Sequence, residues 1–331
     1  MDLVEELIGA AMVGNTERVQ KLLSEGADPN ASEEGSHRRA LAYAANAGSV
    51  ETVSLLLDAG ADIDATDCDG WTPLMVATSS RTEAIASLLL SRGADPNTST
   101  GAGQTPLMIA AAMGLADLTE QLIAANAATE VARDDGFTLL MAARQGGLRS
   151  LIQTLAAQGV SVTEADTDGW TALHYAARFA STETVDLLVE LGADPNAASV
   201  GNETPLVAAV AAGGSDRISA LVAHGARIDT RDIGGWPLLS VAVLNGRATV
   251  IRTLLDHGVD INGRRIDPDE RAADTTPLMA AAAYGDEEIV SLLLQSGADP
   301  TLSDRDGMTA AMWATRQGHH AVASSLSVAR A

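Results

Sequence analysis

The sequence contains very little cysteine and no long apolar run. Its single cysteine, Cys68, excludes an internal disulfide and argues against the disulfide-stapled scaffolds of small secreted domains. No apolar stretch approaches the ~18 residues that a membrane-spanning helix needs, and the first residues lack the basic region of a secretory signal. We therefore expect a soluble, cytoplasmic protein that does not enter a membrane.

Aromatic residues and positive charges are also scarce. Only 3% of residues are aromatic although 46% are hydrophobic, a composition that suits small, closely packed helical units. The 21 basic residues are outnumbered by 44 acidic ones, which gives a formal net charge of −23. This negative field repels nucleic-acid phosphates, so we expect no nucleic-acid binding and favour a basic protein partner.

Patterns that carry catalysis or cofactor binding are missing as well. The sequence has no glycine-rich phosphate loop, no Cys/His metal spacing and no Gly-x-Ser-x-Gly elbow. Its acidic turns lack the 1, 3, 5 ligand series with Gly at 6 and Glu at 12 that binds calcium. We expect no enzymatic activity, no cofactor and no metal.

What the sequence does contain is a repeat. One position, usually the start of a Gly-Ala-Asp motif, recurs at intervals of 34 residues, then six times 33, then 39. A period near 33 residues predicts small structural repeats that are stable only when stacked on their neighbours. The recurring residues are Gly26, Gly60, Gly93, Asn126, Gly159, Gly192, Gly225, Gly258 and Gly297.

One repeat, residues 65–97, shows how the local signals are arranged. Asp69–Gly70 is a turn pair, and Thr72–Pro73 is typical of a helix N-cap followed by proline at the first helical position. This predicts a short first helix. A second helix carries Ile85, Leu88 and Leu89 on one face, and Gly93 supplies a left-handed C-terminal cap.

These signals resemble the ankyrin repeat. The resemblance rests on Asp-Gly-Trp-Thr-Pro-Leu at 69–74 and Leu-Leu-Leu-Ser-Arg-Gly-Ala-Asp-Pro-Asn at 88–97, and it covers nearly the full length. It implies an all-α solenoid of helix-turn-helix repeats joined by β-hairpin-like loops. We count ten repeats in a single domain, 1–331: an N-terminal cap (1–30), eight internal repeats (31–301) and a C-terminal cap (302–331).

Several repeats depart from the family pattern. Where Thr-Pro-Leu is expected, three repeats have other residues, and we predict weaker helix caps there. They are Arg39-Ala40-Leu41, Thr138-Leu139-Leu140 and Pro237-Leu238-Leu239. The ninth repeat carries six extra residues within 263–275, which predicts a protruding loop. Length drift at a tolerant loop tip and a partner contact both explain the insertion.

One position of the first helix carries either histidine or methionine. The resemblance implies that His174, in Thr-Ala-Leu-His at 171–174, forms hydrogen bonds between repeats. A ladder of thioethers can in principle bind Cu(I), but residues one repeat apart, roughly 10 Å, are too far from each other to share an ion. We expect flexible packing instead. The methionines at this position are Met75, Met108, Met141, Met279 and Met312.

Most of the few aromatic residues fall at corresponding places in the repeats. One position lies between the turn glycine and the first helix, and the resemblance places it among the variable contact sites of the concave, hairpin side. It is occupied by Trp71, Phe137, Trp170, Trp236 and, in the last repeat, Met308. Phe179 and Tyr284 fall at the end of the first helix, on the family's variable inner face. Tyr43, Tyr175 and Trp313 share a third position, for which we expect packing.

These observations predict a monomeric, non-enzymatic scaffold that holds a protein partner. Trp and Tyr are enriched at binding hot spots, and aromatic faces attract Arg and Lys, so we expect a basic partner segment in an acidic, aromatic-lined groove. Packing of each aromatic on its neighbour's turn is the competing role. The alternative function is an inhibitor or antitoxin-like regulator that masks a basic, nucleic-acid-binding surface by charge mimicry.

Overall fold

The protein is all helical in the part of the chain that the computed structural model describes, residues 3–143, 149–266 and 274–328. Twenty helices lie there, and the only strand-like features are isolated bridges such as that between Ser32 and Arg39. The predicted all-α class and the hairpin-like loops are confirmed. Contacts divide the chain into an N-terminal unit, Met1–Ser161, and a C-terminal unit, Val162–Ala331. The single domain, with its repeat count and caps, stays a prediction.

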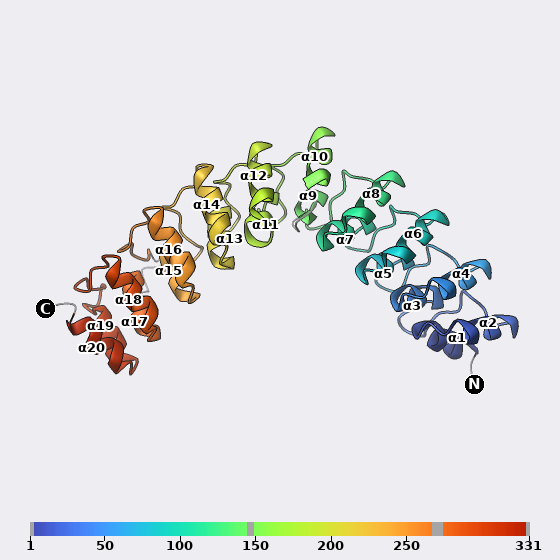
Figure 1. The fold of residues 1–331 in the computed structure, drawn as a ribbon, viewed down its shortest axis with the longest axis horizontal. Coiled ribbons are helices and arrows are strands. Elements are labelled where there is room, and N and C mark those ends of the chain that lie inside the picture. The colour runs from blue at the N-terminus through green and yellow to red at the C-terminus, as the bar shows by residue number, and fades with distance from the viewer. Residues whose placement is uncertain (1–2, 144–148, 267–273, 329–331) are drawn as a thin grey trace. The chain divides into compact units, whose positions relative to one another are not determined.

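In both units the helices come in pairs, and from α3 on the odd-numbered helix of each pair is the shorter one (Figure 1). The even-numbered helices all have nine residues. The N-terminal unit contains α1 (Leu3–Met12), α2 (Thr16–Ser24), α3 (Ala40–Ala47), α4 (Val50–Asp58), α5 (Pro73–Ser79), α6 (Glu83–Ser91), α7 (Pro106–Met113), α8 (Ala116–Ala124), α9 (Leu139–Ala142) and α10 (Arg149–Ala157). The C-terminal unit contains α11 (Ala172–Phe179), α12 (Thr182–Glu190), α13 (Pro205–Ala212), α14 (Ser215–Ala223), α15 (Leu238–Leu244), α16 (Ala248–Asp256), α17 (Pro277–Tyr284), α18 (Glu287–Gln295), α19 (Ala310–Arg316) and α20 (His320–Val328).

The odd-numbered helices begin where the sequence predicts. The hydroxyl of Thr72 accepts a hydrogen bond from the Met75 backbone N–H at 3.3 Å, and Pro73 fills the first helical position. Arg39 and Pro237 provide no side-chain cap, as expected. The weaker cap predicted at Thr138 is wrong, because its hydroxyl accepts from the N–H of the third helical residue without a following proline. The threonine oxygen, not the proline, makes this cap.

The residues that follow the second helices adopt the predicted left-handed conformation. Gly93 has φ of 90°, and Asn126, which replaces glycine at the corresponding position, has φ of 64°. Asparagine tolerates this region better than other side chains because it is short and polar. The nine-residue helices therefore stop at a fixed length and return the chain to the next hairpin.

The core of each unit lies between neighbouring odd-numbered helices. In the N-terminal unit α1, α3, α5, α7 and α9 contact one another in sequence, and α11 to α19 do the same in the C-terminal unit. Leu74, Leu107 and Leu206 on these helices are fully buried. Full burial of a leucine contributes about 1.5–3 kcal/mol, so each helix pair depends on the next for its stability. No described helix is both long and apolar enough to cross a membrane.

The predicted link between repeats at His174 is present. Its Nε2 lies 2.9 Å from the carbonyl oxygen of Glu203 in the next repeat, and its Nδ1 accepts from the Thr171 N–H at 3.1 Å. Met141 substitutes partly, because its sulfur accepts a weak hydrogen bond from the Thr138 N–H. Met75, Met108, Met141 and Met279 are buried, as the packing role requires. Met312 is not, since it is 48% exposed.

Ser240 occupies the same position in the repeat that contains α15. Its hydroxyl is buried and has no hydrogen-bond partner in the structure. The hydroxyl of Thr275, next to the start of α17, is buried without a partner as well. A buried hydroxyl that makes no hydrogen bond costs about 1–3 kcal/mol, so serine satisfies this position less well than histidine does.

The protruding loop predicted within 263–275 falls largely at residues 267–273, which lie outside the described residues.

We predict that His174 makes the folded chain sensitive to mild acid. Burial lowers the pKa of its imidazole, so as pH falls below about 6.5 the unfolded chain takes up this proton before the folded chain does. Stability is therefore lost as pH falls through this window. Thermal unfolding of the wild type and of His174→Met at pH 7 and pH 5 measures the effect. The variant is expected to lose less stability on acidification, and equal losses would contradict the assignment.

Candidate functional site

The aspartate at the start of a hairpin turn fixes the aromatic residue four positions later. Asp67 Oδ1 accepts hydrogen bonds from the backbone N–H groups of Asp69, at 3.0 Å, and Trp71, at 2.9 Å. Three turns of the C-terminal unit repeat this geometry. The pairs are Asp166 with Trp170, Asp232 with Trp236 and Asp304 with Met308. These first acids shape the turn, whereas the second acid is exposed in the three turns that have one, as Asp69 is in the first example.

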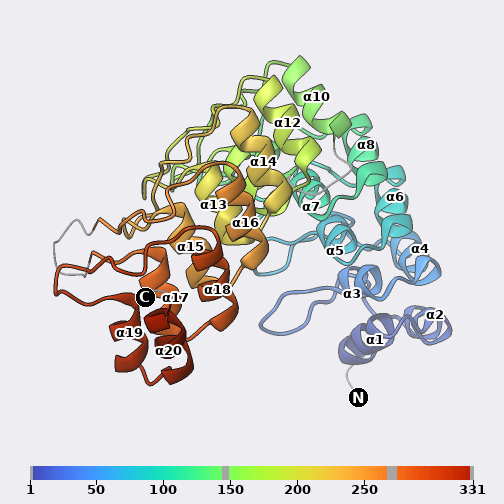
Figure 2. The same ribbon diagram turned by 60° about the vertical axis from the view of Figure 1, so that its left-hand side comes forward.

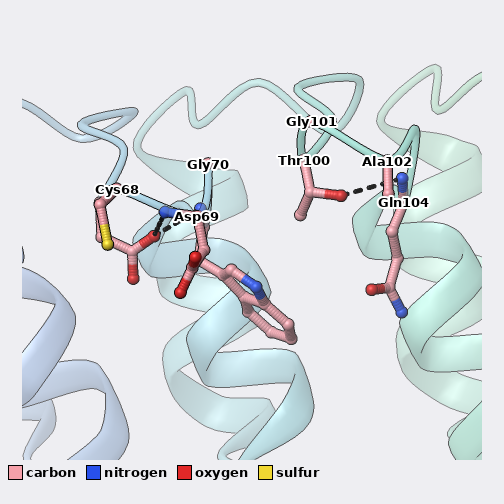
Figure 3. Close-up of a pocket in the computed structure, with 9 residues that line it drawn as sticks. Cys68, Asp69, Gly70, Thr100, Gly101, Ala102 and Gln104 are labelled. Atoms are coloured by element: carbon pink, nitrogen blue, oxygen red, sulfur yellow. Dashed lines mark hydrogen bonds between the residues drawn. The ribbon is translucent and has the colours of Figure 1, made fainter. Parts of the chain in front are cut away.

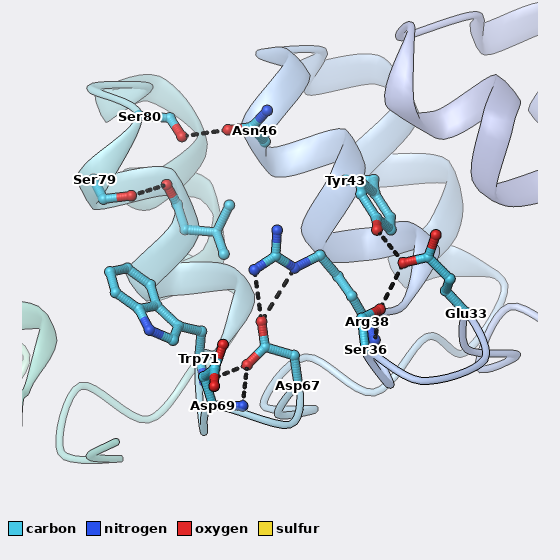
Figure 4. Close-up of polar contacts among 11 residues, drawn as sticks. Glu33, Ser36, Arg38, Tyr43, Asn46, Asp67, Asp69, Trp71, Ser79 and Ser80 are labelled. Atoms are coloured by element: carbon cyan, nitrogen blue, oxygen red, sulfur yellow. Dashed lines mark hydrogen bonds and ion pairs between the residues drawn. The ribbon is translucent and has the colours of Figure 1, made fainter. Parts of the chain in front are cut away.

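The second carboxylate oxygen of Asp67 binds an arginine from the preceding repeat. Arg38 donates to Oδ2 from Nη2 at 2.7 Å and from Nε at 3.1 Å (Figure 4). The Asp67 side chain is only 3% exposed. Burial raises its pKa, but the ion pair and the two turn N–H groups outweigh that effect and hold the pKa below its ordinary value. Asp67 is therefore an ionised anchor that joins two hairpins.

A hollow of about 610 Å³ lies next to this anchor in the N-terminal unit. Its walls are two successive hairpins, Asp67–Trp71 and Thr100–Gln104 (Figure 3). Trp71 is half-buried, and within the described residues no arginine or lysine covers its ring. Asp69 is exposed and forms no ion pair within that same part of the chain. The hollow thus presents an indole without a stacked cation beside a carboxylate that forms no ion pair, although Arg38 interacts with that carboxylate electrostatically.

Trp170 has different surroundings in the C-terminal unit. Its ring centroid lies 5.5 Å from that of His174 and 5.1 Å from that of Tyr175. The guanidinium of Arg178 lies 5.5 Å from the Trp170 centroid and 5.3 Å from that of Phe179. This cluster links the hairpin to α11, so Trp170 has a structural role whatever else it does.

Two further aromatics of the predicted groove also contact arginines of their own chain. Arg265 lies 4.7 Å from the Trp236 centroid, and Arg133 lies 5.3 Å from that of Phe137. A cation already stacked on a ring takes the place that a partner's cation would use. Four aromatic residues directly precede the first helix of their repeats. Of these, the geometry favours Trp71 as the one that binds a cation from a partner.

The third aromatic position is more than a packing site. Tyr43 donates its hydroxyl hydrogen to Glu33 at 2.6 Å, as Figure 4 shows. Tyr175 donates to Asp166 Oδ2 at 2.7 Å, and the indole N–H of Trp313 donates to Asp304 Oδ2 at 2.8 Å. The expectation of simple packing is therefore incomplete, because each of these residues also ties its helix to an acid of its own hairpin.

The remaining predicted residues occupy the ends of helices and a turn. Phe179 and Tyr284 are the last residues of α11 and α17, as predicted, and both are exposed. Met308 is half-buried, and its backbone N–H binds Asp304. Trp71 and Phe137 belong to the N-terminal unit, and the other five belong to the C-terminal unit. One groove lined by all seven residues stays a prediction.

Sequence reasoning missed Arg38 as part of the site. It stands in Ser36–Arg39, a segment without the family's turn motif, and its partner Asp67 is 29 residues away. The sequence points to this pair only if neighbouring repeats are aligned, which places Arg38 in the hairpin next to that of Asp67. An arginine side chain is long enough to span the two hairpins.

We predict that Arg38→Met lowers the free energy of unfolding by about 2 kcal/mol, because the carboxylate of Asp67 stays buried without its ion partner. Urea denaturation measures the change. The matched control is Arg92→Met, which removes an exposed ion pair with Asp58 and is expected to change stability by less than about 0.5 kcal/mol. Equal effects of the two substitutions would show that Asp67 does not need Arg38.

Comparison with known families agrees with the geometry. The model for ankyrin repeats in three copies matches residues 7–100, 107–199, 198–265 and 264–329. No curated protein matches the chain. Paired short helices, hairpin-like loops and a family match over most of the length lead to one conclusion: the chain belongs to the ankyrin-repeat family.

Proposed function

We propose that this chain is a non-enzymatic scaffold that binds a basic segment of a protein partner at the hollow beside Trp71. Ankyrin repeats indicate a protein–protein interaction scaffold. The basic character of the partner and its place on this chain are our inference. The observation that carries it is the uncovered ring of Trp71 next to the exposed carboxylate of Asp69.

The chemistry of the hollow suits a cationic side chain. A guanidinium or ammonium group over an indole gains about 0.5–2 kcal/mol, more when water is excluded, and a carboxylate beside the ring adds a charge-assisted hydrogen bond. Gln104, on the opposite wall, offers an amide oxygen as a further acceptor. The formal net charge of −23 raises the local concentration of a basic segment before contact is made.

The other predicted residues contribute less to partner binding in this proposal. Phe179 and Tyr284 are exposed and add apolar contact area in the C-terminal unit. Trp170, Trp236 and Phe137 serve mainly to hold their hairpins, because arginines of the same chain already stack on them. We also propose that the protein acts as a monomer in the cytoplasm, in keeping with its one exposed, unpaired cysteine.

We predict that Trp71→Ala weakens binding of a basic peptide at least tenfold, and that Asp69→Asn weakens it severalfold. The probe is a dye-labelled peptide of four Arg-Gly-Ser repeats, titrated against the full chain at 50 mM and 150 mM salt by fluorescence anisotropy. The control is Cys68→Ser, an exposed residue of the same turn that contributes neither ring nor charge.

The same titration separates this proposal from charge mimicry. If affinity falls steeply with salt but does not respond to Trp71→Ala, the net charge alone attracts the peptide, and masking of a basic surface explains the protein better. If Trp71→Ala lowers the unfolding temperature without weakening the complex, the ring is structural. Either result overturns the proposed site.

A further inference from the structure

Three consecutive hairpins of the C-terminal unit carry an exposed aliphatic side chain, two of them in the turn and the third, Ile266, at the end of the described segment 149–266. Val200, Ile233 and Ile266 follow one another at intervals of 33 residues and are 82%, 78% and 58% exposed. We name these three side chains the tip ridge. The same position in the other hairpins is small, polar or charged: Gly35, Cys68, Gly101, Asp134, Thr167 and Arg305. The repeat itself therefore does not require an aliphatic residue there.

The three tips belong to neighbouring hairpins, whose loops project on the same side of the C-terminal unit (Figure 2). A Cβ atom added to Gly201 would lie 3.2 Å from Cδ1 of Ile233, so Ile233 leans on the hairpin that carries Val200. On its other side, the Ile266 backbone N–H donates to the carbonyl oxygen of Gly235 at 3.0 Å. Ile233 thus packs on the hairpin of Val200, and the hairpin of Ile266 is hydrogen-bonded to that of Ile233.

Three arginines of these hairpins lack a carboxylate partner within the described residues. Arg231 donates to the carbonyl oxygens of Gly235 and Arg264, and Arg265 donates from Nε to that of Gly234. Arg264 donates to the carbonyl oxygens of Asp274 and Ser303. A guanidinium has five N–H donors, so each arginine keeps several for another acceptor. Three arginines without an ion pair among the described residues stand out in a chain with 44 acidic residues, although Arg231 still interacts with Asp229 electrostatically.

Two described acids near Arg231 are already engaged. Asp229 pairs with Arg227, and Asp232 Oδ1 accepts the N–H groups of Gly234 and Trp236. A hollow of about 340 Å³ between the first two of these hairpins is lined by two arginines, Arg227 and Arg231, and by one acid, Asp229, which is paired with Arg227. Arg231 is therefore the guanidinium of this hollow that an acidic side chain from a partner can bind without displacing an ion pair.

We propose that the tip ridge and its arginines form a second docking surface, which binds an acidic protein segment that carries apolar side chains. Carboxylates match the guanidinium donors in geometry and charge, and aliphatic or aromatic side chains of the segment cover the ridge. A nucleic acid would offer phosphates to the arginines but nothing to cover three exposed aliphatic side chains. This surface lies in a different unit from the hollow at Trp71 and is opposite to it in charge.

A peptide titration tests this proposal. The probe is a dye-labelled peptide of three Glu-Leu-Asp-Phe repeats, added to the full chain and followed by fluorescence anisotropy. We expect the double variant Val200→Ser, Ile233→Ser to bind about tenfold more weakly or worse, and Arg265→Gln to bind severalfold more weakly. Thermal unfolding checks that both variants stay folded. Trp71→Ala is expected to leave this peptide's affinity unchanged, which separates the two surfaces.

The matched control is Val13→Ser, which removes an aliphatic side chain that is 74% exposed in the N-terminal unit. It is expected to bind the peptide like the wild type. The proposal is overturned if the wild type shows no binding up to about 1 mM peptide, if Val13→Ser weakens binding as much as the double variant, or if a peptide with serine in place of leucine and phenylalanine binds equally well. Sedimentation that shows wild-type self-association, lost in the double variant, would make a second copy the occupant and would also overturn it.

Discussion

A pair of short helices cannot bury its own apolar side chains, and the rest of the structure depends on this constraint. Leucines such as Leu74 and Leu206 are fully buried only because the next odd-numbered helix covers them. Polar groups at the same interfaces must then find partners across repeats, as His174 does at the Glu203 carbonyl. Where the side chain is too short to reach, as at Ser240, a buried hydroxyl stays unsatisfied. Stability is therefore distributed unevenly along the repeats.

The turn aspartates show how one side chain links the fold to its surface. One oxygen of Asp67 closes the turn and holds Trp71, and the other binds Arg38. In two other turns the second oxygen accepts a hydrogen bond, from the hydroxyl of Tyr175 or from the indole N–H of Trp313. Because both oxygens are occupied, these acids contribute geometry more than binding capacity. The charge available to a partner comes from the exposed acids, such as Asp69, that the turn leaves free to face water.

The fold could be predicted from the sequence because its signals are local. Thr72–Pro73 starts a helix and Gly93 ends the next one through contacts within a few residues, and the 33-residue period repeats these signals along the chain. The candidate site could be predicted only in part, since its environment is set by long side chains from neighbouring repeats. Nothing in the sequence near Trp236 shows that Arg265 covers its ring, and nothing near Trp71 shows that its ring stays uncovered.

This difference between the rings explains why an aromatic ladder need not be a uniform binding groove. An arginine on a ring of its own chain neutralises part of the negative field and stiffens a hairpin, but it also uses the face that a partner's cation would contact. Arg265 does this at Trp236 while its Nε donates to the Gly234 carbonyl oxygen, and the neighbouring Ile266 is exposed. An arginine in a hairpin thus removes a site for a partner's cation at the ring that it covers. Its remaining N–H donors provide a site for a partner's carboxylate instead. The two surfaces that we propose, opposite in charge, can share one repeated framework because each hairpin presents its own side chains on the same backbone.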